Sequence, residues 1–358
     1  YQAYTEISSP TDLPALSPVR SWVEYRDQTL PRGHSASAVA NIDGTEFFYL
    51  LGGSMKRNYP DADGRNVFIN RLLTETAYGS VVPDQMPTIA SSTALTARRA
   101  YAAAAALDGK LYVLGGYSDI DSNSSFRTWV DEATVSANGI DQWTRRDDLA
   151  LPMGTSGLAA VAYEGRLYIA GGDDGGEAFH TVYSWSSAEG SWRAETAMEK
   201  GRSYFGLVAR NGYLYALGGR ESNSGNCQSS IERCPVGSGG VLGPWEMIRS
   251  LPFDPDDPTG DIQGGLGEFG TCIWSSNGMD YLVVAGGVRN GKIAGELWLT
   301  PIQTNGDLGE FIRGADILPA RRGSTALAVN ATLLIAGGES GWMGYTEYSW
   351  DDILSPGP

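Results

Sequence analysis

Histidine is almost absent from the chain, which holds only His34 and His180 in 358 residues. A metal centre with three or more imidazole ligands therefore cannot form within one chain, and no group of Cys and His residues has the spacing of zinc ligands. Phosphate-binding loops and nucleophile-elbow sequences are missing as well. Cofactor-free proton transfer is the chemistry left to an enzyme, so we expect no cofactor and no metal.

Lysine is nearly as scarce, with four lysines among 26 basic residues, and the formal net charge is −16. A generally basic surface for binding nucleic acid is therefore not expected. Strong acidity favours solubility in a salty or extracellular setting. No run of eighteen apolar residues occurs, which predicts that no segment spans a membrane.

The chain begins at Tyr1 without a Met or a basic-plus-apolar leader. We interpret it as a secreted protein, extracellular or periplasmic, whose signal segment was removed or lies outside the sequence. Cys227 and Cys234, with six residues between them, are spaced compatibly with a local disulfide, which would suit an oxidising compartment. Two reduced thiols are the alternative. The third cysteine, Cys272, is expected to pack in an apolar strand.

Six apolar runs of strand character each end in a pair of glycines, and this pattern organises the chain. The first glycines of the pairs lie 47 to 68 residues apart, at Gly52, Gly115, Gly171, Gly218, Gly286 and Gly337. A tight-turn signal precedes each run, at residues 43–44, 108–109, 164–165, 211–212, 277–278 and, more weakly, 330–331. Because such pairs supply the positive φ of a two-residue hairpin, each repeat is predicted to open with two paired strands.

Two further strand-like segments follow in most repeats. The third strand is predicted from aromatic-rich segments at 67–73, 127–131, 181–185, 296–298 and 346–350. The two Tyr-Ser-Trp copies, at 183–185 and 348–350, are interpreted as the same element. The fourth strand usually carries Trp after a Gly turn, at Trp143, Trp192 and Trp245, with Phe311 in that place in the fifth repeat. Four strands in each of six repeats predict an all-β protein, a six-bladed β-propeller.

A glycine pair, a Tyr in the third strand and a Trp in the fourth, at roughly fifty-residue spacing, resemble the kelch repeat. The resemblance covers about residues 20–352 and implies a single propeller at 20–354. Its blades are placed at 34–97, 98–152, 153–200, 201–262, 263–319 and 320–354 together with 20–33. The segment 20–33 is interpreted as an N-terminal strand that completes the last blade and closes the ring. Residues 1–19 would form an N-terminal arm and 355–358 a tail.

Long insertions mark the expected functional faces, since a propeller places its variable parts in loops. They span 54–66, 118–125, 221–228 and 252–263. The last contains four aspartates between Asp254 and Asp261, whose carboxylates could hold a hard cation. Their spacing does not match an EF-hand loop, so we favour a solvated acidic loop.

Counting back from the hairpin turns aligns the first strands of the six repeats. Four repeats have arginine at the aligned position, and two have Thr155 and Leu266; the arginines are Arg32, Arg99, Arg202 and Arg321. Two residues further on come His34, Tyr101, Gly157, Tyr204, Glu268 and Gly323. These positions should ring the entrance of the central channel, because the first strand of each propeller blade is innermost. The arginines either draw an anion into the channel mouth or hydrogen-bond loop carbonyls of the next blade, and both interpretations stay open.

The residues just after each glycine pair are expected on the same face, at Ser54, Tyr117, Asp173, Arg220, Val288 and Glu339. The candidates for ligand binding are Arg32, Arg99, Tyr101, Asp173, Arg202, Arg220, Arg321 and Glu339. The candidates for proton transfer are His34, Tyr204 and Glu268.

The sequence is compatible with two functions. The first is a recognition module that binds an anionic small molecule, a glycan or an acidic protein segment at the arginine-lined mouth. The second is a secreted, cofactor-free isomerase of the mutarotase or epimerase type, or a lyase, acting on an anionic sugar or small acid. The resemblance supports the second only in that kelch propellers that interconvert sugar-acid isomers use Arg, Glu and Tyr at the channel.

Overall fold

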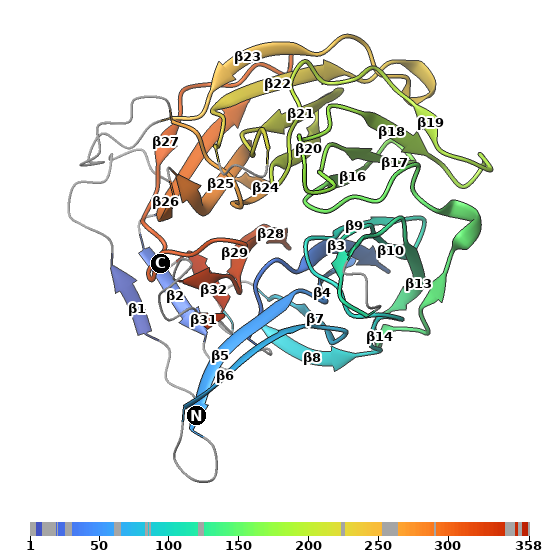
Figure 1. Ribbon diagram of the computed structural model, residues 1–358. Coiled ribbons are helices and arrows are strands. Elements are labelled where there is room, and N and C mark those ends of the chain that lie inside the picture. Colours follow the sequence, from blue (N-terminus) through green and yellow to red (C-terminus); the bar gives the residue numbers. More distant parts are fainter. Residues whose placement is uncertain are drawn as a thin grey trace.

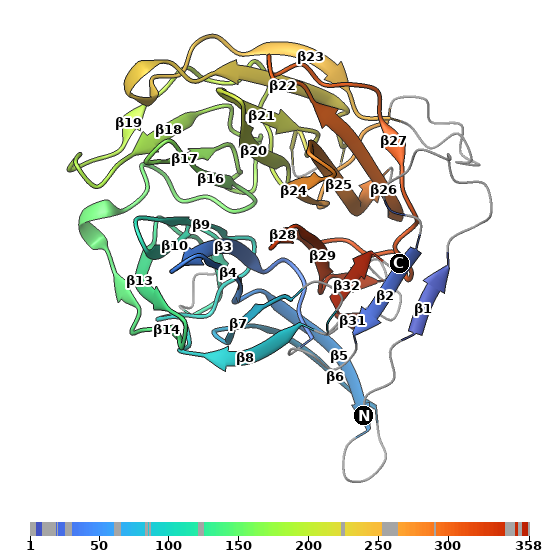
Figure 2. The same cartoon turned by 180° about the vertical axis from the view of Figure 1, so that it is seen from behind.

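The protein is a ring of six antiparallel sheets of four or five strands, with no α-helix among the residues described (Figures 1 and 2). The computed structural model describes residues 5–8, 19, 21–25, 31–60, 66–82, 85, 87–120, 125–222, 226–252, 264–289, 291–340, 348–349 and 353–356. No helix in this part of the chain has the length and apolar character needed to cross a membrane. The prediction of an all-β, six-bladed propeller is confirmed.

The first three blades follow one another along the chain. Blade 1 consists of β3 (Ala36–Ile42), β4 (Thr45–Leu51), β7 (Thr76–Ser80) and β8 (Thr88–Ser92). Blade 2 consists of β9 (Ala103–Leu107), β10 (Lys110–Leu114), β13 (Val130–Ser136) and β15 (Thr144–Arg145), with β14 (Gly139–Ile140) also on β13. Blade 3 consists of β16 (Ala159–Tyr163), β17 (Arg166–Ala170), β18 (Val182–Trp185) and β19 (Arg193–Ala194).

The other three blades complete the circle. Blade 4 consists of β20 (Gly206–Arg210), β21 (Tyr213–Leu217), β22 (Ser230–Pro235) and β23 (Glu246–Ser250). Blade 5 consists of β24 (Gly270–Ser276), β25 (Met279–Arg289), β26 (Lys292–Ile302) and β27 (Ile312–Arg313). Blade 6 contains β28 (Thr325–Val329), β29 (Thr332–Ala336) and β32 (Ile353–Pro356).

The sheet of blade 6 continues onto the N-terminal part of the chain. Its strand order is β1 (Thr5–Ser8), β2 (Ser21–Tyr25), β32, β29, β28, with Trp22 opposite Pro356. Residues 20 and 26–30 of the expected closing segment lie outside the described residues. Closure of the ring by this segment stays a prediction, as do the domain boundaries.

Two predicted third strands are wrong. Residues 67–73 do not enter blade 1: β6 (Asn66–Leu72) instead pairs with β5 (Ser54–Pro60) in a separate hairpin, and β7 is the third strand. In blade 6 the third strand is β32, whereas β31 (Tyr348–Ser349) pairs with β30 (Glu339–Ser340) outside the blade. The two Tyr-Ser-Trp copies are therefore different elements. The insertion expected as a loop at 54–66 is in part strand β5.

All six predicted hairpin turns form. Each connects a first strand to a second strand through two residues, both with positive φ, from Asp43 and Gly44 to Asn330 and Ala331. Two positive φ values are the requirement of the tight turn that matches strand twist. The sixth turn keeps the same geometry although an alanine, with φ 63°, replaces the usual glycine.

The glycine pairs join each blade to the next. The N–H of each second glycine donates to the carbonyl of the aligned first-strand residue in the following blade, as Gly53 does to Arg99 (2.9 Å) and Gly338 to Arg32 (2.8 Å). A Cβ on the first glycine would strike the same carbonyl, at 2.3 Å for Gly171 against Arg202. The pairs therefore allow a close backbone approach at every blade junction.

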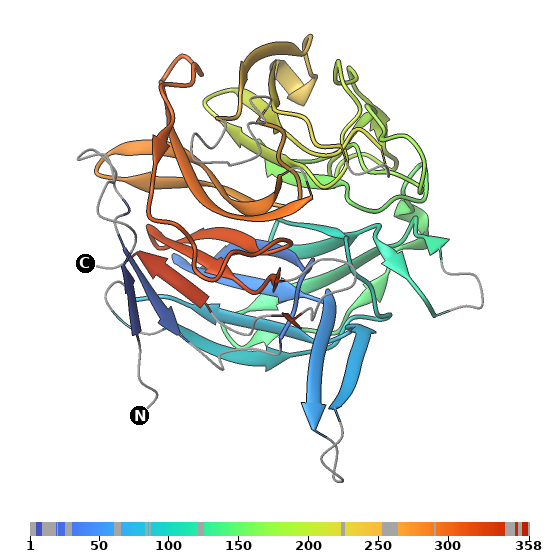
Figure 3. The same ribbon diagram turned by 60° about the vertical axis from the view of Figure 1, so that its left-hand side comes forward.

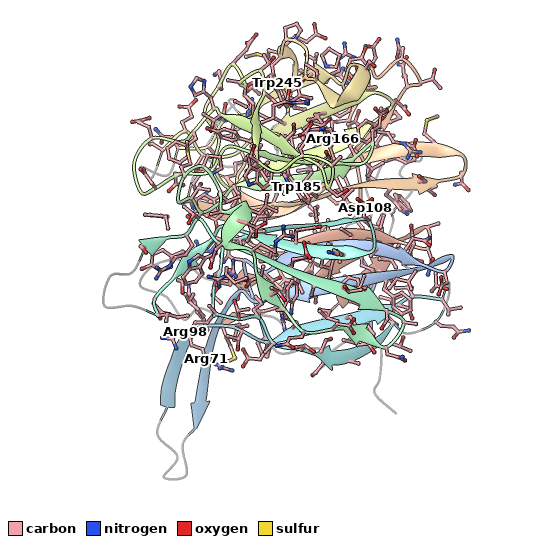
Figure 4. The ribbon with its side chains drawn as sticks, turned by 90° about the vertical axis from the view of Figure 1, so that its right-hand side faces the viewer. Arg71, Arg98, Asp108, Arg166, Trp185 and Trp245 are labelled. Carbon is pink, nitrogen blue, oxygen red and sulfur yellow. The ribbon has the colours of Figure 1, made fainter. Side chains whose placement is uncertain are left out.

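Aromatic side chains of the outer strands add a second link between blades. Trp143, Trp192 and Trp245 each precede a fourth strand and donate from Nε1 to a carbonyl of the preceding blade, at 2.9 to 3.0 Å. Figure 4 shows Trp185 and Trp245 within their blades. The apolar core lies between neighbouring sheets, where alanine-rich first strands pack against larger residues such as Leu111 and Tyr49.

Candidate functional site

Six backbone hydrogen bonds form a closed ring around the central channel. The N–H of each ring residue donates to the carbonyl of the ring residue in the preceding blade, at 2.7 to 3.1 Å, and the last bond runs from His34 to Gly323. All six have φ between 52° and 63°. The members of this ring are His34, Tyr101, Gly157, Tyr204, Glu268 and Gly323. The alignment of the first strands is therefore confirmed.

The residues after the glycine pairs lie beside this ring. Each forms a β-bridge with the residue that precedes a ring residue, as Ser54 does with Gly33 and Glu339 with Arg322. We call this set the channel mouth: the six ring residues, Lys56, and the bridged residues Gly33, Ser54, Ala100, Tyr117, Ser156, Asp173, Ser203, Arg220, Gly267, Val288, Arg322 and Glu339. The hairpin turns lie at the other end of the first strands, and Figure 4 shows Asp108, in one turn, far from Arg98 near the mouth.

The four aligned arginines do not line the mouth, which corrects that interpretation. Arg32, Arg99, Arg202 and Arg321 are at most 2 % exposed and their side chains lie inside the blades. Each donates to the carbonyl of the first glycine in its own blade, for example Arg202 to Gly218 (2.6 Å) and Arg321 to Gly337 (3.0 Å). The carbonyl-binding alternative was the right one, although the carbonyls belong to the same blade.

Acidic side chains also pair with Arg202 and Arg99. Arg202 donates to Glu232 (2.7 Å), and Arg99 forms an ion pair with Asp131. Burial lowers the pKa of Arg99 to about 10, even though Asp131 opposes the shift. The aligned arginines therefore stabilise the blades and are not available to a ligand.

A second set of charged side chains does gather at the mouth. Glu339 accepts hydrogen bonds from Ser54 Oγ (2.7 Å) and Lys56 Nζ (3.1 Å), and its carboxylate is fully buried. His34 Nδ1 lies 3.5 Å from Glu339 Oε1, and Arg322 lies 3.6 Å from Glu339 Oε2. These contacts join blades 1 and 6.

Glu268 forms the other centre of the cluster. Its carboxylate contacts His34 Nε2 at 2.8 Å, forms an ion pair with Arg220, and lies 3.7 Å from Arg322. His34 is therefore held between two carboxylates from blades 5 and 6, one facing each ring nitrogen. We call Lys56, Arg220, Arg322, His34, Glu268 and Glu339 the charge cluster.

The charge cluster shifts the pKa values of its members. Burial opposes ionisation of Glu268, but the hydrogen bond from His34 and the nearby arginines outweigh it and lower the pKa of Glu268 to about 2. The pKa of Glu339 is lowered as well, because His34, Lys56 and Ser54 outweigh its burial. Burial alone would lower the pKa of His34, but the two carboxylates raise it above its ordinary value. Both carboxylates are therefore ionised at neutral pH.

Two tyrosines stand beside the cluster. Tyr101 contacts the His34 ring at a centroid distance of 4.5 Å and the Tyr204 ring at 5.5 Å, and Arg220 lies over Tyr204. Burial raises the pKa of Tyr204 to about 12 and that of Tyr101 further. A cavity of about 140 Å³ adjoins these rings and is lined by all six ring residues and the residue after each.

Several sequence candidates thus come together and others do not. His34, Tyr101, Tyr204, Glu268, Arg220 and Glu339 share the mouth. Asp173 is also there, but its carboxylate is buried and accepts a hydrogen bond from Gly175 N (2.9 Å). Lys56 was missed because it lies on the inserted hairpin; its rarity, as one of four lysines, was the available signal.

The remaining predictions concern cysteines and metals. Cys227 and Cys234 are not joined by a disulfide, so the reduced-thiol alternative is correct. Cys234 is buried in blade 4, whereas Cys227 forms a β-bridge with Arg220 at the mouth. No group of three acidic, His or Cys residues suited to a metal occurs in the described ranges. The acidic segment Asp254–Asp261 lies outside them.

Comparisons with known proteins agree with the fold. The family model of the kelch motif matches residues 98–130 and 154–199, in blades 2 and 3. Kelch-like protein 23 of Mus musculus is 26 % identical over 151 residues, 42 % of this chain and 24 % of that protein. Kelch-like ECH-associated protein 1B of Danio rerio is 34 % identical over 113 residues, 30 % of this chain and 18 % of that protein. The matches span about a quarter of these relatives or less.

A solved structure extends the likeness to the whole ring. The structure of YjhT has a TM-score of 0.63 and 16 % identity, and the match covers 92 % of this chain and 96 % of that one. At 16 % sequence identity this similarity shows the fold alone. The molecule is thus a six-bladed β-propeller built on repeated glycine pairs. The family model identifies kelch motifs in blades 2 and 3, and the chain is similar over part of its length to kelch-like proteins.

Proposed function

We propose that this propeller is a recognition module that binds a carboxylate-bearing segment of a partner protein at the channel mouth. Kelch propellers are typically protein-interaction modules. One relative, kelch-like ECH-associated protein 1B, is named for its association with another protein. A repeat fold does not by itself define a ligand, so the chemistry has to come from the mouth.

The proposal depends on the excess of cations in the charge cluster. The cationic side chains of Lys56, Arg220 and Arg322 are 14 %, 13 % and 11 % exposed. Within the described part of the chain, the carboxylates that face them belong to Glu268 and Glu339, and both are nearly inaccessible. The accessible charge at the mouth is therefore positive, in a chain of net charge −16. Guanidinium groups suit carboxylates because they offer paired donors in a fixed plane.

Binding of the peptide acetyl-(Thr-Glu)4-amide, measured by fluorescence anisotropy, tests the proposal. We expect Arg220→Ala and Arg322→Ala each to weaken binding about tenfold, the loss of one charge-assisted contact. Arg98→Ala is the matched control, because Arg98 pairs with Asp119 and lies outside the charge cluster. A (Thr-Gln)4 peptide should not bind. Equal affinity for both peptides, or full affinity in both variants, would exclude the proposed site.

An isomerase acting on an anionic sugar is the second candidate, favoured by one observation. His34 lies between two carboxylates beside the cavity and has a raised pKa, so it is the one group in the cluster suited to carry a proton near neutral pH. Glu268, with a pKa of about 2, and Tyr204, at about 12, are poorly matched to that task. Turnover of sialic and uronic acids that is lost in His34→Gln would favour the enzyme over the recognition module.

A further inference from the structure

The imidazole of His34 is held in place at the centre of the charge cluster. Its side chain is 5 % exposed. It packs against Gly323, where a Cβ would lie 2.5 Å from the ring, and against Tyr101, whose ring centroid is 4.5 Å away. Because these contacts fix the ring, a change in its protonation acts directly on the charged groups that face it.

Each ring nitrogen of His34 faces a carboxylate. Nε2 contacts Glu268 of blade 5 at 2.8 Å, and Nδ1 lies 3.5 Å from Oε1 of Glu339 in blade 6. A neutral imidazole has one N–H donor and one bare nitrogen, so it can donate to only one of the two carboxylates. The imidazolium donates from both nitrogens and balances one of the two negative charges. The geometry therefore favours the protonated ring: burial lowers the pKa of His34, but the two carboxylates outweigh burial and raise it.

The same two carboxylates also hold the cations of the mouth. Arg220 forms an ion pair with Glu268, and Lys56 bonds to Glu339 at 3.1 Å. Arg322 lies between the carboxylates, 3.7 Å from Glu268 and 3.6 Å from Glu339. Lys56 belongs to β5, whose hairpin with β6 stands clear of the ring as the blue strands of Figure 3. The carboxylates are therefore shared between the imidazole and the three cations, and the charge of the imidazole sets how strongly they attract those cations.

We propose that protonation of His34 controls the binding of carboxylates at the channel mouth. The imidazolium satisfies Glu268 and Glu339 from within, so the three cations can direct their donors to an incoming carboxylate. Loss of the proton removes one positive charge from the charge cluster and leaves a bare nitrogen facing a carboxylate, which draws the cations inward. Binding is therefore strongest where the imidazole is protonated and weakens as the pH rises. This inference rests on the proposed recognition of carboxylates and adds its regulation.

Neighbouring groups with shifted pKa values lie outside the range in which the imidazole should titrate. Burial raises the pKa of Cys227 to about 11 and that of Tyr204 to about 12, and it raises that of Tyr101 further. The glutamates of an acidic peptide, with an ordinary pKa of about 4.3, stay ionised above pH 6. The chain holds one further histidine, His180, which is exposed ahead of β18 and supplies a matched control.

The affinity of acetyl-(Thr-Glu)4-amide, measured by fluorescence anisotropy from pH 6 to 9 at constant ionic strength, tests the proposal. We expect the dissociation constant to rise about tenfold over this range, a change usual for coupling between two sites. His34→Gln should bind with an affinity that does not change with pH and is close to that of the unmodified protein at pH 9. His180→Gln should keep the full pH dependence. Unchanged thermal midpoints at pH 9 verify that both variants are folded.

Calorimetry of the unmodified protein gives a second test that needs no variant. Titrations at pH 7 and 8 in buffers of different ionisation enthalpy give the number of protons taken up on binding. Because coupling is reciprocal, a ligand that binds the protonated form better has to promote proton uptake. We expect uptake of a fraction of one proton, retained in His180→Gln and lost in His34→Gln. Proton release, or no uptake by the unmodified protein, would overturn the proposal.

The outcomes separate this inference from the proposed function. If the affinity is the same at every pH while Arg322→Ala is weakened, control by His34 is wrong and recognition at the mouth stands. If the affinity of His34→Gln falls with pH as much as that of the unmodified protein, another group is responsible and the inference is wrong. If the peptide binds at no pH, both proposals fail.

Discussion

The blade junctions repeat one backbone interaction, whereas the side chains of the channel mouth differ from blade to blade. At the junctions the same hydrogen bond recurs six times, from the second glycine to a carbonyl that belongs to arginine, threonine or leucine. At the mouth the backbone ring is equally regular, but its side chains range from glycine to tyrosine and glutamate. Because both sets of bonds use backbone atoms alone, the fold leaves the mouth side chains free to differ, and that is where specificity can reside.

Arg321 and Arg322 show the division within one dipeptide. Arg321 is fully buried and donates to Gly337 O inside blade 6. Arg322 directs its guanidinium toward Glu268 and Glu339 at the mouth. Neighbouring side chains of an extended chain point in opposite directions, so one residue step separates an arginine buried in the blade from an arginine that faces the mouth.

The largest expected effect comes from removing an arginine side chain that is buried inside a blade. Arg202→Ala leaves the buried carboxylate of Glu232 without its cation, which should lower the free energy of unfolding by about 3 kcal/mol. Arg98→Ala, which removes an ion pair whose two side chains are more than 40 % exposed, should change it by about 1 kcal/mol or less. Urea unfolding of the two variants measures both values, and equal losses would contradict the distinction between arginines buried in the blades and arginines near the mouth.

Periodic features were predictable from the sequence because they depend on local backbone chemistry. The turns at 43–44 through 330–331 and the alignment of Arg32, Arg99, Arg202 and Arg321 are confirmed. The direction of those arginine side chains was not predictable, since counting residues gives a position along a strand but not which side it faces. The burial of the guanidinium groups follows from their bonds to the glycine carbonyls.

Contacts between residues far apart in the chain could not be predicted from the sequence, for a different reason. The bond from Ser54 to Glu339 joins residues 285 apart, and that from His34 to Glu268 joins residues 234 apart. The segment 67–73 has the composition of a third strand, but its partner is the hairpin strand β5 and not β4. Local pattern alone cannot choose between two possible partners, so the inserted hairpin was missed, and with it the place of Lys56 in the charge cluster.

A change of pH should alter the stabilising contribution of the channel mouth and leave that of the blade junctions unchanged. The pKa of His34 is raised in the folded protein above its ordinary value of 6.5. Its stabilising contribution is therefore fully present below pH 6.5 and is lost as the pH rises through the raised value. The unfolding free energy, measured from pH 5 to 9, should fall over this window, and His34→Gln should remove that part of the dependence.

At low pH the carboxylates of the charge cluster make the free energy of unfolding depend on pH in the opposite direction. The pKa of Glu268 is about 2 in the folded protein and 4.5 otherwise, so its contribution is present above pH 4.5 and disappears as the pH falls toward 2. His34→Gln should weaken this acid dependence too, because His34 holds the carboxylate ionised. A pH profile identical in the unmodified protein and His34→Gln would mean that the pair does not form in solution.

The smallest expected effect concerns the one hairpin turn that departs from its repeat. Ala331 takes the turn position that glycine holds in the other five hairpins, with φ 63°, where an L-residue with a Cβ is strained. Ala331→Gly should raise the free energy of unfolding by about 0.5–1 kcal/mol, because relief of the strain outweighs the added freedom of the unfolded chain. The reverse change in an equivalent turn, Gly165→Ala, should lower it by about 1 kcal/mol. A Cβ on Gly165 would meet no atom within 4 Å, so a loss there reports φ strain alone. Opposite signs in the two variants would establish that the six turns are one element, whereas a loss in both would show that the sixth turn has its own optimum.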